Sequence, residues 1–289
     1  MQYIKLMRVK HWIKNLLIFL PVIFSGKLDI EINNIFQLIL GFLVFSLTSS
    51  VVYILNDIVD APQDRKHEQK KNRPIASGRV KSKQAVILII FLLIAILWLI
   101  CYLNKFYSYY FIICLVFYLL INLAYSMKLK NFPIIDITII VLGYIIRVVY
   151  GGILVSVEIS KWLYLTVISM ALFLILGKRR NENIKYNGNI STRTVLSFYT
   201  LDFLDISMYT CLGLTNVFYT LWATNINTLK NLGNNMIILT IPLVILICVK
   251  YVLNIEKGTS GDPTEVLLND RWLIFLVTIY MVFILYLYI

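Results

Sequence analysis

Charged residues are scarce in this chain of 289 residues. They make up 15% of the sequence, whereas hydrophobic residues make up 60%. An ordinary soluble domain has about 25% charged and about 45–50% apolar residues. No soluble protein of this length could bury so much apolar surface, so the composition disfavours a soluble helical bundle and favours a membrane protein.

Residues that bind metals through nitrogen or sulfur are also few. The two histidines, His11 and His67, do not suffice for a metal cluster. We interpret the cysteines as small apolar residues with no disulfide or metal role, because they lie in apolar runs without CxxC spacing. The four are Cys101, Cys114, Cys211 and Cys248. No cleavage site of a signal peptide follows residue 20. No internal repeat or linker divides the chain, so we expect a single domain over residues 1–289.

Long apolar runs recur along the whole sequence. Each approaches the roughly 20 residues that a helix needs to cross a bilayer. Only helices and closed barrels satisfy their backbone groups in lipid, and these runs lack the alternation of barrel strands. We therefore predict an all-α polytopic membrane protein with about nine transmembrane helices. The predicted spans lie near residues 11–25, 34–55, 84–103, 107–125, 134–155, 160–177, 203–224, 235–253 and 271–289.

Lysine and arginine are distributed unevenly between the loops. If the N-terminus lies inside, 22 of the 27 lysines and arginines fall in inside segments, four in outside loops and one, Arg147, within a span. This bias predicts a cytoplasmic N-terminus and a protein integral to the cytoplasmic (inner) membrane. The active-site loops, near residues 56–83, 126–133, 178–195 and 254–270, then face the cytoplasm. Positive loops beside anionic membrane lipid also explain the net charge of +12, and we expect no nucleic-acid partner.

Aspartates cluster at the end of the second run. Asp57, Asp60 and Asp64 are spaced i, i+3 and i+7, which places them on one face if the helix continues. Pro62 lies among them and is expected to kink or end the helix. Three like charges on one face favour a divalent cation, and Mg²⁺ usually takes one or two carboxylates with waters and substrate phosphates. We predict a metal site on these aspartates, with Asn56 as a further ligand or a hydrogen-bond partner of a substrate.

A basic segment follows the aspartates within a few residues. Lys71 and Arg73 belong to it, and we predict that they bind a phosphate chain whose other side is held by the metal. The alternative is a solvated loop of mixed charge, in which surface ion pairs contribute little to stability.

Further ionisable residues lie in and beside the fourth and fifth runs. Tyr125, Lys128 and Lys130 close the fourth run, and Asp136 and Arg147 lie inside the fifth. The last two share a helix face, but more than about 15 Å of helix separates them, so they cannot pair with each other. Ionisable groups inside a span usually mark a partner, a cavity or a site. For this pair, substrate binding and a structural role are both open.

Two more polar segments follow later runs. Lys178, Arg179 and Arg180 come directly after the sixth run. They are either phosphate ligands or an anchor that sets the topology. The loop before the last run is rich in glycine and carries Asp262 and Glu265, which makes it a candidate substrate lid or helix cap.

The segment Asn56–Gly78 resembles the first signature of the UbiA superfamily of membrane prenyltransferases. That signature is NDxxDxxxD followed by a basic stretch and RPxxxG, and its position after the second span also agrees. In that superfamily, aromatic prenyltransferases carry a second aspartate-rich motif after the sixth span, which holds a second Mg²⁺. This sequence departs from the pattern, because Gly177–Glu182 carries three cations there.

The departure resembles one branch, the decaprenyl-phosphate phosphoribosyltransferases. Arg8–Asn15 (with Lys14), Tyr125–Lys130, Asp136, Arg147 and the loop with Asp262 resemble that branch too. The resemblance implies transfer of 5-phosphoribose from phosphoribosyl pyrophosphate to a polyprenyl phosphate, with release of pyrophosphate, for cell-envelope polysaccharide synthesis. It also implies a clamp of cations that overcomes the repulsion between two polyanions. The candidates for the clamp are Lys128, Lys130, Lys178, Arg179 and Arg180.

Two other functions are weighed against phosphoribosyl transfer. The first is prenyl transfer from a prenyl diphosphate to an aromatic or other acceptor, which the missing second aspartate motif disfavours. The second is lipid binding or transport without chemistry, for which midplane charges and broken helices are typical. The polar residues here gather at one membrane face, which favours an enzyme. The oligomeric state is open, a homo-oligomer included.

Overall fold

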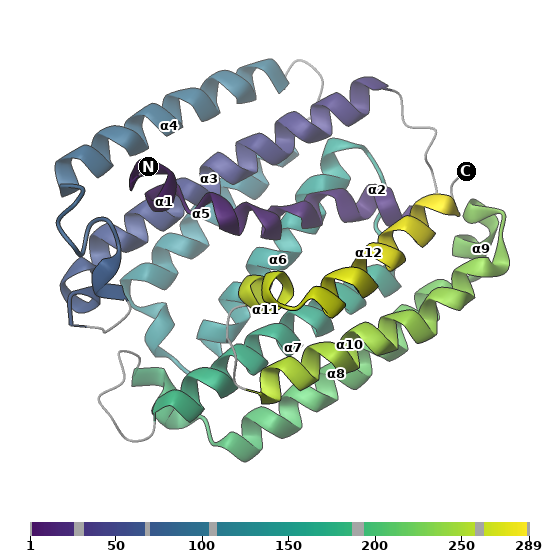
Figure 1. Ribbon diagram of the computed structural model, residues 1–289. Coiled ribbons are helices and arrows are strands. Elements are labelled where there is room, and N and C mark those ends of the chain that lie inside the picture. The colour runs from purple at the N-terminus through teal and green to yellow at the C-terminus, as the bar shows by residue number, and fades with distance from the viewer. Residues whose placement is uncertain are drawn as a thin grey trace.

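The computed structural model describes residues 2–25, 32–66, 70–103, 109–186, 194–257 and 263–287. These residues form helices and short connections and include no strand, which confirms the all-α prediction (Figure 1). The helices are α1 Gln2–Met7, η1 Val9–Phe19, α2 Leu20–Phe24, α3 Ile32–Asp64, η2 Lys70–Asn72, α4 Ser82–Leu103, α5 Tyr110–Met127, η3 Leu129–Asn131, α6 Ile135–Leu154, α7 Lys161–Tyr186, η4 Thr194–Phe198, α8 Leu201–Ala223, α9 Ile226–Leu232, η5 Asn235–Leu239, α10 Thr240–Glu256, α11 Pro263–Asn269 and α12 Arg271–Tyr286, where η marks a 3₁₀ helix.

Helical structure occurs at each of the nine predicted span positions. In the described residues, six helical segments are long and apolar enough to cross a membrane, or seven if α11 and α12, which meet at 94°, form one bent span. Helix α8 and the short η1–α2 segment are outside that set. The chain is therefore a polytopic helical membrane protein, and the count of nine and the cytoplasmic N-terminus stay predictions.

Helix α4 shows how the bundle meets lipid. It lies at one edge of the molecule (Figure 1), and large apolar side chains such as Phe91 and Trp98 point outward from it. Helix α3, in contrast, is mostly buried along its span. A helix that is apolar all round lies either in a protein core or in a membrane. Outward-facing apolar side chains on α4 place its outer face against lipid.

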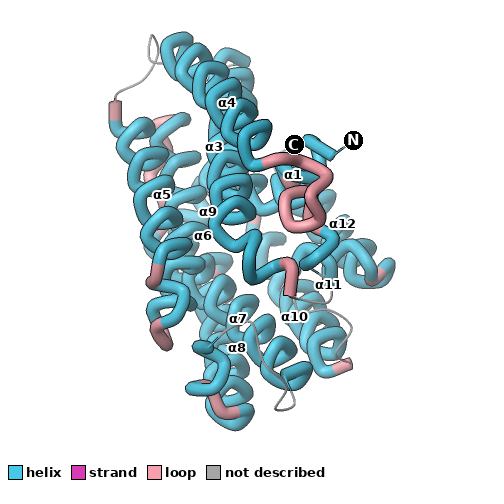
Figure 2. Tube along the Cα trace, turned by 90° about the vertical axis from the view of Figure 1, so that its left-hand side faces the viewer, coloured by secondary structure: helices cyan, strands magenta, loops and turns pink. Residues whose placement is uncertain are grey.

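Helix α6 packs between the N-terminal helices of the bundle and α7. It contacts α3, α5 and η1 on one side and α7 on the other, and α7 in turn pairs closely with α8. Figure 2 shows the same order, with α3, α4 and α5 above and α7, α8 and α10 below. The C-terminal ends of α3 and α5 and the start of α6 meet at one end of the bundle.

The first predicted span is an irregular segment that crosses α3 and α6. It consists of the 11-residue 3₁₀ helix η1 and the short α2, although 3₁₀ helices longer than four residues are uncommon. Polar contacts hold it: Trp12 Nε1 donates to Ser50 Oγ at 3.0 Å, and Asn15 Nδ2 donates to Ser46 Oγ at 3.0 Å. A Cβ on Gly151 of α6 would lie 1.9 Å from the carbonyl oxygen of Ile18. Glycine at position 151 therefore permits the close approach of η1.

We expect Gly151→Ala to lower the thermal unfolding temperature in detergent, because backbone atoms of η1 would have to move. Overpacking of this kind costs about 1–3 kcal/mol. The matched control is Gly213→Ala on α8, where a Cβ meets no atom within 4 Å. Alanine is favoured over glycine in a helix interior by up to about 1 kcal/mol, so the control is expected to keep or gain stability. Equal unfolding temperatures for the two variants would contradict the close approach.

Candidate functional site

Helix α3 continues past Pro62 and ends at Asp64, so the proline lies in its last turn. The helix therefore ends two residues beyond Pro62, where a kink or an end was expected. The continuation keeps Asp57, Asp60 and Asp64 in helical register, but the expected single set of three carboxylates is not formed, because Asp60 has a separate partner, Lys130. Asp57 and Asp64 are 2% and 4% exposed. Two buried carboxylates this close need positive partners, since an unpaired buried charge is costly.

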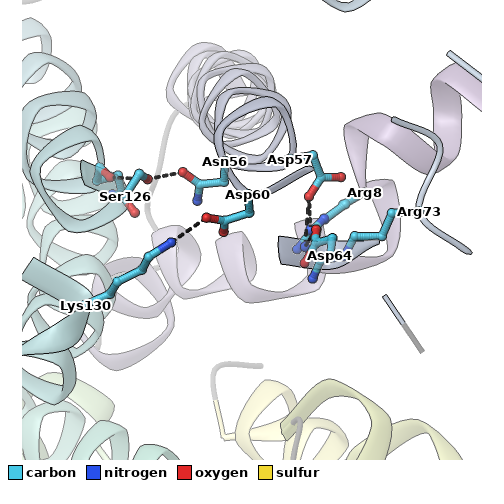
Figure 3. Close-up of polar contacts among 9 residues, drawn as sticks. Arg8, Asn56, Asp57, Asp60, Asp64, Arg73, Ser126 and Lys130 are labelled. Atoms are coloured by element: carbon cyan, nitrogen blue, oxygen red, sulfur yellow. Dashed lines mark hydrogen bonds and ion pairs between the residues drawn. The ribbon is translucent and has the colours of Figure 1, made fainter. Parts of the chain in front are cut away.

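Two arginines supply that charge to Asp57 and Asp64. The Nη1 atom of Arg73 lies 3.2 Å from Asp57 Oδ1 and 2.7 Å from Asp64 Oδ2. Arg8, from the junction of α1 and η1, pairs with Asp57 as well, and its guanidinium lies 5.1 Å from the ring centroid of Tyr53. Figure 3 shows both arginines converging on the two aspartates. We name Asp57 and Asp64 the acid pair.

The other two predicted residues of α3 face a different neighbour. Asp60 pairs with Lys130 of η3, and Asn56 accepts a hydrogen bond from the Ser126 hydroxyl of α5. Figure 3 shows this group on the opposite side from the two arginines. In the described residues, no three His, Cys, Asp or Glu side chains are grouped so as to hold a metal ion. The three aspartates thus divide into the acid pair and Asp60, each with its own cations.

The acid pair fits a hard divalent cation better than the full set of three. Its two carboxylates already share one positive group, the Nη1 of Arg73. Oxygen donors of this kind, one or two carboxylates completed by water and phosphate oxygens, are typical of Mg²⁺ sites. The part of Asp60 in metal binding stays a prediction.

A second cluster lies between the start of α6 and the C-terminal part of α7. The Nε of Arg179 donates to Asp136 Oδ2 at 2.8 Å, and its Nη1 donates to Glu182 Oε2 at 2.6 Å. Both Arg179 and Asp136 are fully buried. The Tyr199 hydroxyl donates to Asp136 Oδ1 at 2.6 Å. Arg179, a predicted phosphate ligand, therefore faces two carboxylates in this structure, and its binding to a substrate stays a prediction.

Tyr199 keeps its proton at physiological pH. Burial and the hydrogen bond to Asp136 raise the pKa of its hydroxyl above the ordinary value. The protonated phenol donates one hydrogen bond and accepts another, from the backbone N–H of Ile134 at 2.7 Å. Sequence analysis did not select Tyr199, because a single tyrosine after the α7 loop carries no pattern.

Arg147 lies deep in the bundle and is held by neutral groups. Its Nε donates to Asn15 Oδ1 at 2.7 Å, its Nη1 to the carbonyl of Gly143 at 2.5 Å, and its Nη2 to the Tyr118 hydroxyl at 3.1 Å. The guanidinium also lies within 5.8 Å of the ring centroids of three aromatic residues of α3, α5 and α6. The prediction that Asp136 and Arg147 do not pair with each other is confirmed. These contacts favour a structural role for Arg147, and substrate binding by it stays a prediction.

The remaining predicted residues lie on several different elements. Arg180 pairs with Asp205 of α8, and Lys178 beside it is half-buried. Five further predicted residues lie in the described part of the chain. Two are half-buried, Lys14 and Tyr125, and three are exposed, Lys71, Lys128 and Glu265. The predicted residue Asp262 lies outside the described residues. Arg8 and Ser126 were not selected from the sequence as site residues. Arg8 does begin the Arg8–Asn15 segment of the family resemblance, which is the signal that could have found it.

Comparison with known proteins gives one family. The model of the UbiA prenyltransferase family matches residues 19–279. A protein of Mycolicibacterium smegmatis named decaprenyl-phosphate phosphoribosyltransferase is 30% identical over 279 residues, covering 93% of this chain and 86% of the relative. A protein of that name from Mycobacterium tuberculosis (strain H37Rv) is 28% identical over 275 residues, with 93% and 88% covered.

Solved structures share the fold. A UbiA homologue from Archaeoglobus fulgidus bound to GPP and Mg²⁺ superposes with a TM-score of 0.72 at 18% identity, covering 100% of this chain and 98% of the other. A structure of digeranylgeranylglyceryl phosphate synthase gives 0.63 at 21% identity, with 99% and 96% covered. At these identities the likeness shows the arrangement of the helices alone.

We expect Arg179→Met to lower stability strongly. Removing one partner of a buried ion pair costs about 3–5 kcal/mol, because the other charges stay buried. Lys178→Met, next to it on a half-buried position, is the matched control and is expected to cost less. Thermal unfolding in detergent measures both. A stable Arg179→Met protein with weakened binding of phosphorylated substrates would instead assign Arg179 to the phosphate clamp.

Proposed function

Because the chain belongs to the UbiA prenyltransferase family, we propose that it transfers 5-phosphoribose from phosphoribosyl pyrophosphate to a polyprenyl phosphate and releases pyrophosphate. The observation that carries this proposal is the acid pair, which lies at the position of the family signature. Its two carboxylates share the guanidinium group of Arg73. The relatives named decaprenyl-phosphate phosphoribosyltransferase support the same reaction over nearly the whole chain.

The donor pyrophosphate is assigned to the side of α3 that carries the acid pair. Asp57 and Asp64 would hold a divalent ion, which when bound supplies positive charge to the leaving pyrophosphate. Arg8 and Arg73 already lie at these carboxylates and supply charged donors for phosphate oxygens. Arginine suits this task because its planar group binds two oxygens at once.

The acceptor phosphate is assigned to the opposite side, near Lys130. A phosphate oxygen of the lipid forms a bond to the anomeric carbon of the ribose. The bond from that carbon to pyrophosphate breaks, and its electron pair leaves with the pyrophosphate. The attacking oxygen is already anionic, so no strong base is needed.

Charge repulsion is the main barrier to bringing the substrates together, because a phosphomonoester alone carries about −1.5 to −2. Two lysines are candidates to offset that charge on the acceptor side. Exposed Lys128 directly follows α5, and Lys130 lies in η3.

The distribution of positive charge between the loops supports a cytoplasmic location of the reaction. The excess of lysine and arginine in the loops on that side supports a position of the end of α3 on the cytoplasmic side of the inner membrane. Water-soluble phosphoribosyl pyrophosphate reaches the acid pair from that side, and the lipid acceptor comes from the bilayer. The apolar outer faces of α4 and α5 lie against that lipid.

Prenyl transfer is the second candidate. The match of residues 19–279 to the UbiA prenyltransferase family supports it. The C-terminal part of α7 argues against it, because Glu182 of α7 and Asp136 of α6 are both engaged by Arg179. A second metal on these residues would have to displace a buried arginine.

The test is a membrane assay with radiolabelled phosphoribosyl pyrophosphate, polyprenyl phosphate and Mg²⁺, in which label is followed into the lipid phase. We expect label in lipid with Mg²⁺ and none with a chelator. Asp57→Asn and Asp64→Asn are each expected to lower the rate by about a hundredfold or more, because charge stabilisation of the leaving group is lost.

The matched control is Asp202→Asn, an exposed aspartate in the first turn of α8, which is expected to keep the wild-type rate. Absence of label with intact protein and both substrates present would refute phosphoribosyl transfer. A positive result with geranyl diphosphate and an aromatic acceptor in its place would establish prenyl transfer.

A further inference from the structure

The connection between α5 and α6 contains a strained turn. Ile134 has φ 66° and ψ −45°, and the N–H of Ile135 donates to the carbonyl of Pro133 at 2.7 Å. A three-residue turn with these angles is a γ-turn of the rare, strained form. Positive φ is a genuine outlier for a β-branched residue, and such a conformation persists only when neighbours hold it.

Tyr199 is the neighbour that holds this turn. Its hydroxyl accepts the Ile134 N–H at 2.7 Å and donates to Asp136 Oδ1 at 2.6 Å. Asp136 is in turn fixed by Arg179, and its own backbone N–H donates to the carbonyl of Phe132. One phenol oxygen thus joins the strained residue to the fully buried ion pair between α6 and α7.

Lys130 lies close to this turn in the chain. Lys130 is four residues before Ile134, in η3, and its ammonium group pairs with Asp60 of α3. The short segment between Lys130 and Ile134 is tied locally, because the N–H of Phe132 donates to the carbonyl of Leu129 at 3.2 Å. Three residues separate Ile134 from Lys130, so the held turn and the lysine are neighbours in one short connection.

We propose that Tyr199 is a positioning residue that, by bridging the Ile134 N–H and the Asp136 carboxylate, holds the α5–α6 turn and thereby places Lys130 at the acceptor side of the site. The assignment of Lys130 to the acceptor phosphate rests on the proposed function. The bridge itself rests on the geometry of the turn and is independent of the reaction.

The first test is amide hydrogen exchange of the purified protein, comparing wild type with Tyr199→Phe. The ring of Tyr199 stacks on Phe203 with centroids 6.0 Å apart, so phenylalanine is expected to keep its place and lose only the hydroxyl. We expect exchange across residues 129–136 to become about tenfold faster, because the hydrogen bond to the Ile134 N–H is gone. Tyr209→Phe, which loses a hydroxyl bond to Glu256, is the matched control and is expected to leave this segment unchanged.

The second test is rescue by glycine at position 134. Glycine adopts positive φ without steric cost, so a turn with Ile134→Gly needs no tyrosine to hold it. In the transfer assay, Tyr199→Phe is expected to raise the KM for polyprenyl phosphate about tenfold and to leave the KM for phosphoribosyl pyrophosphate nearly unchanged. The double variant Tyr199→Phe/Ile134→Gly is expected to recover most of that loss.

Unchanged exchange in Tyr199→Phe would overturn the proposal. Losses that simply add in the double variant would also overturn it, because they would show that Tyr199 acts through Asp136 alone. If no phosphoribosyl transfer is found but the exchange result is as expected, the bridge stands and the proposed reaction fails.

Discussion

Charge pairing at the end of α3 is the interaction on which the architecture of the site depends. A long apolar helix carries the buried Asp57 and Asp64 and the half-buried Asp60 to the edge of the bundle, where each has a positive partner. The partners come from three different segments: Arg8 from the N-terminal junction, Arg73 from the loop after η2, and Lys130 from η3. Pairing the carboxylates therefore also brings together the segments that would surround a polyphosphate.

The second cluster obeys the same constraint but has a different consequence. Arg179 is buried with Asp136 and Glu182, so its charge is paired inside the protein. The three cations after the sixth run, which look like a phosphate clamp in the sequence, thus include one that ties α7 to α6 and one that ties α7 to α8. In this structure, the cations at α3 are better placed to meet a substrate, since Arg8, Arg73 and Lys130 keep part of their side chains exposed.

The helices and the spacing of the aspartates could be predicted from the sequence, because both are local properties. Apolar runs give helices, and positions 57, 60 and 64 stay in helical register whatever surrounds them. The pairing of those residues could not be predicted, because partners such as Arg8 and Tyr199 lie 49 and 63 residues away from the aspartates that they contact. The close packing of η1 on Gly151 was also beyond prediction, since it joins segments that are far apart in the sequence. The strained turn at Ile134 has no sequence signal, because an isoleucine there gives no hint of positive φ.

The most direct measurement of the central claim is equilibrium binding of radiolabelled phosphoribosyl pyrophosphate to the purified protein, with Mg²⁺ and with a chelator. The account predicts saturable binding that requires the metal, is competed by pyrophosphate, and is lost when both Asp57 and Asp64 are asparagine. Binding of equal strength in the chelator, or in the protein without the acid pair, would contradict the assignment of the donor to this end of α3.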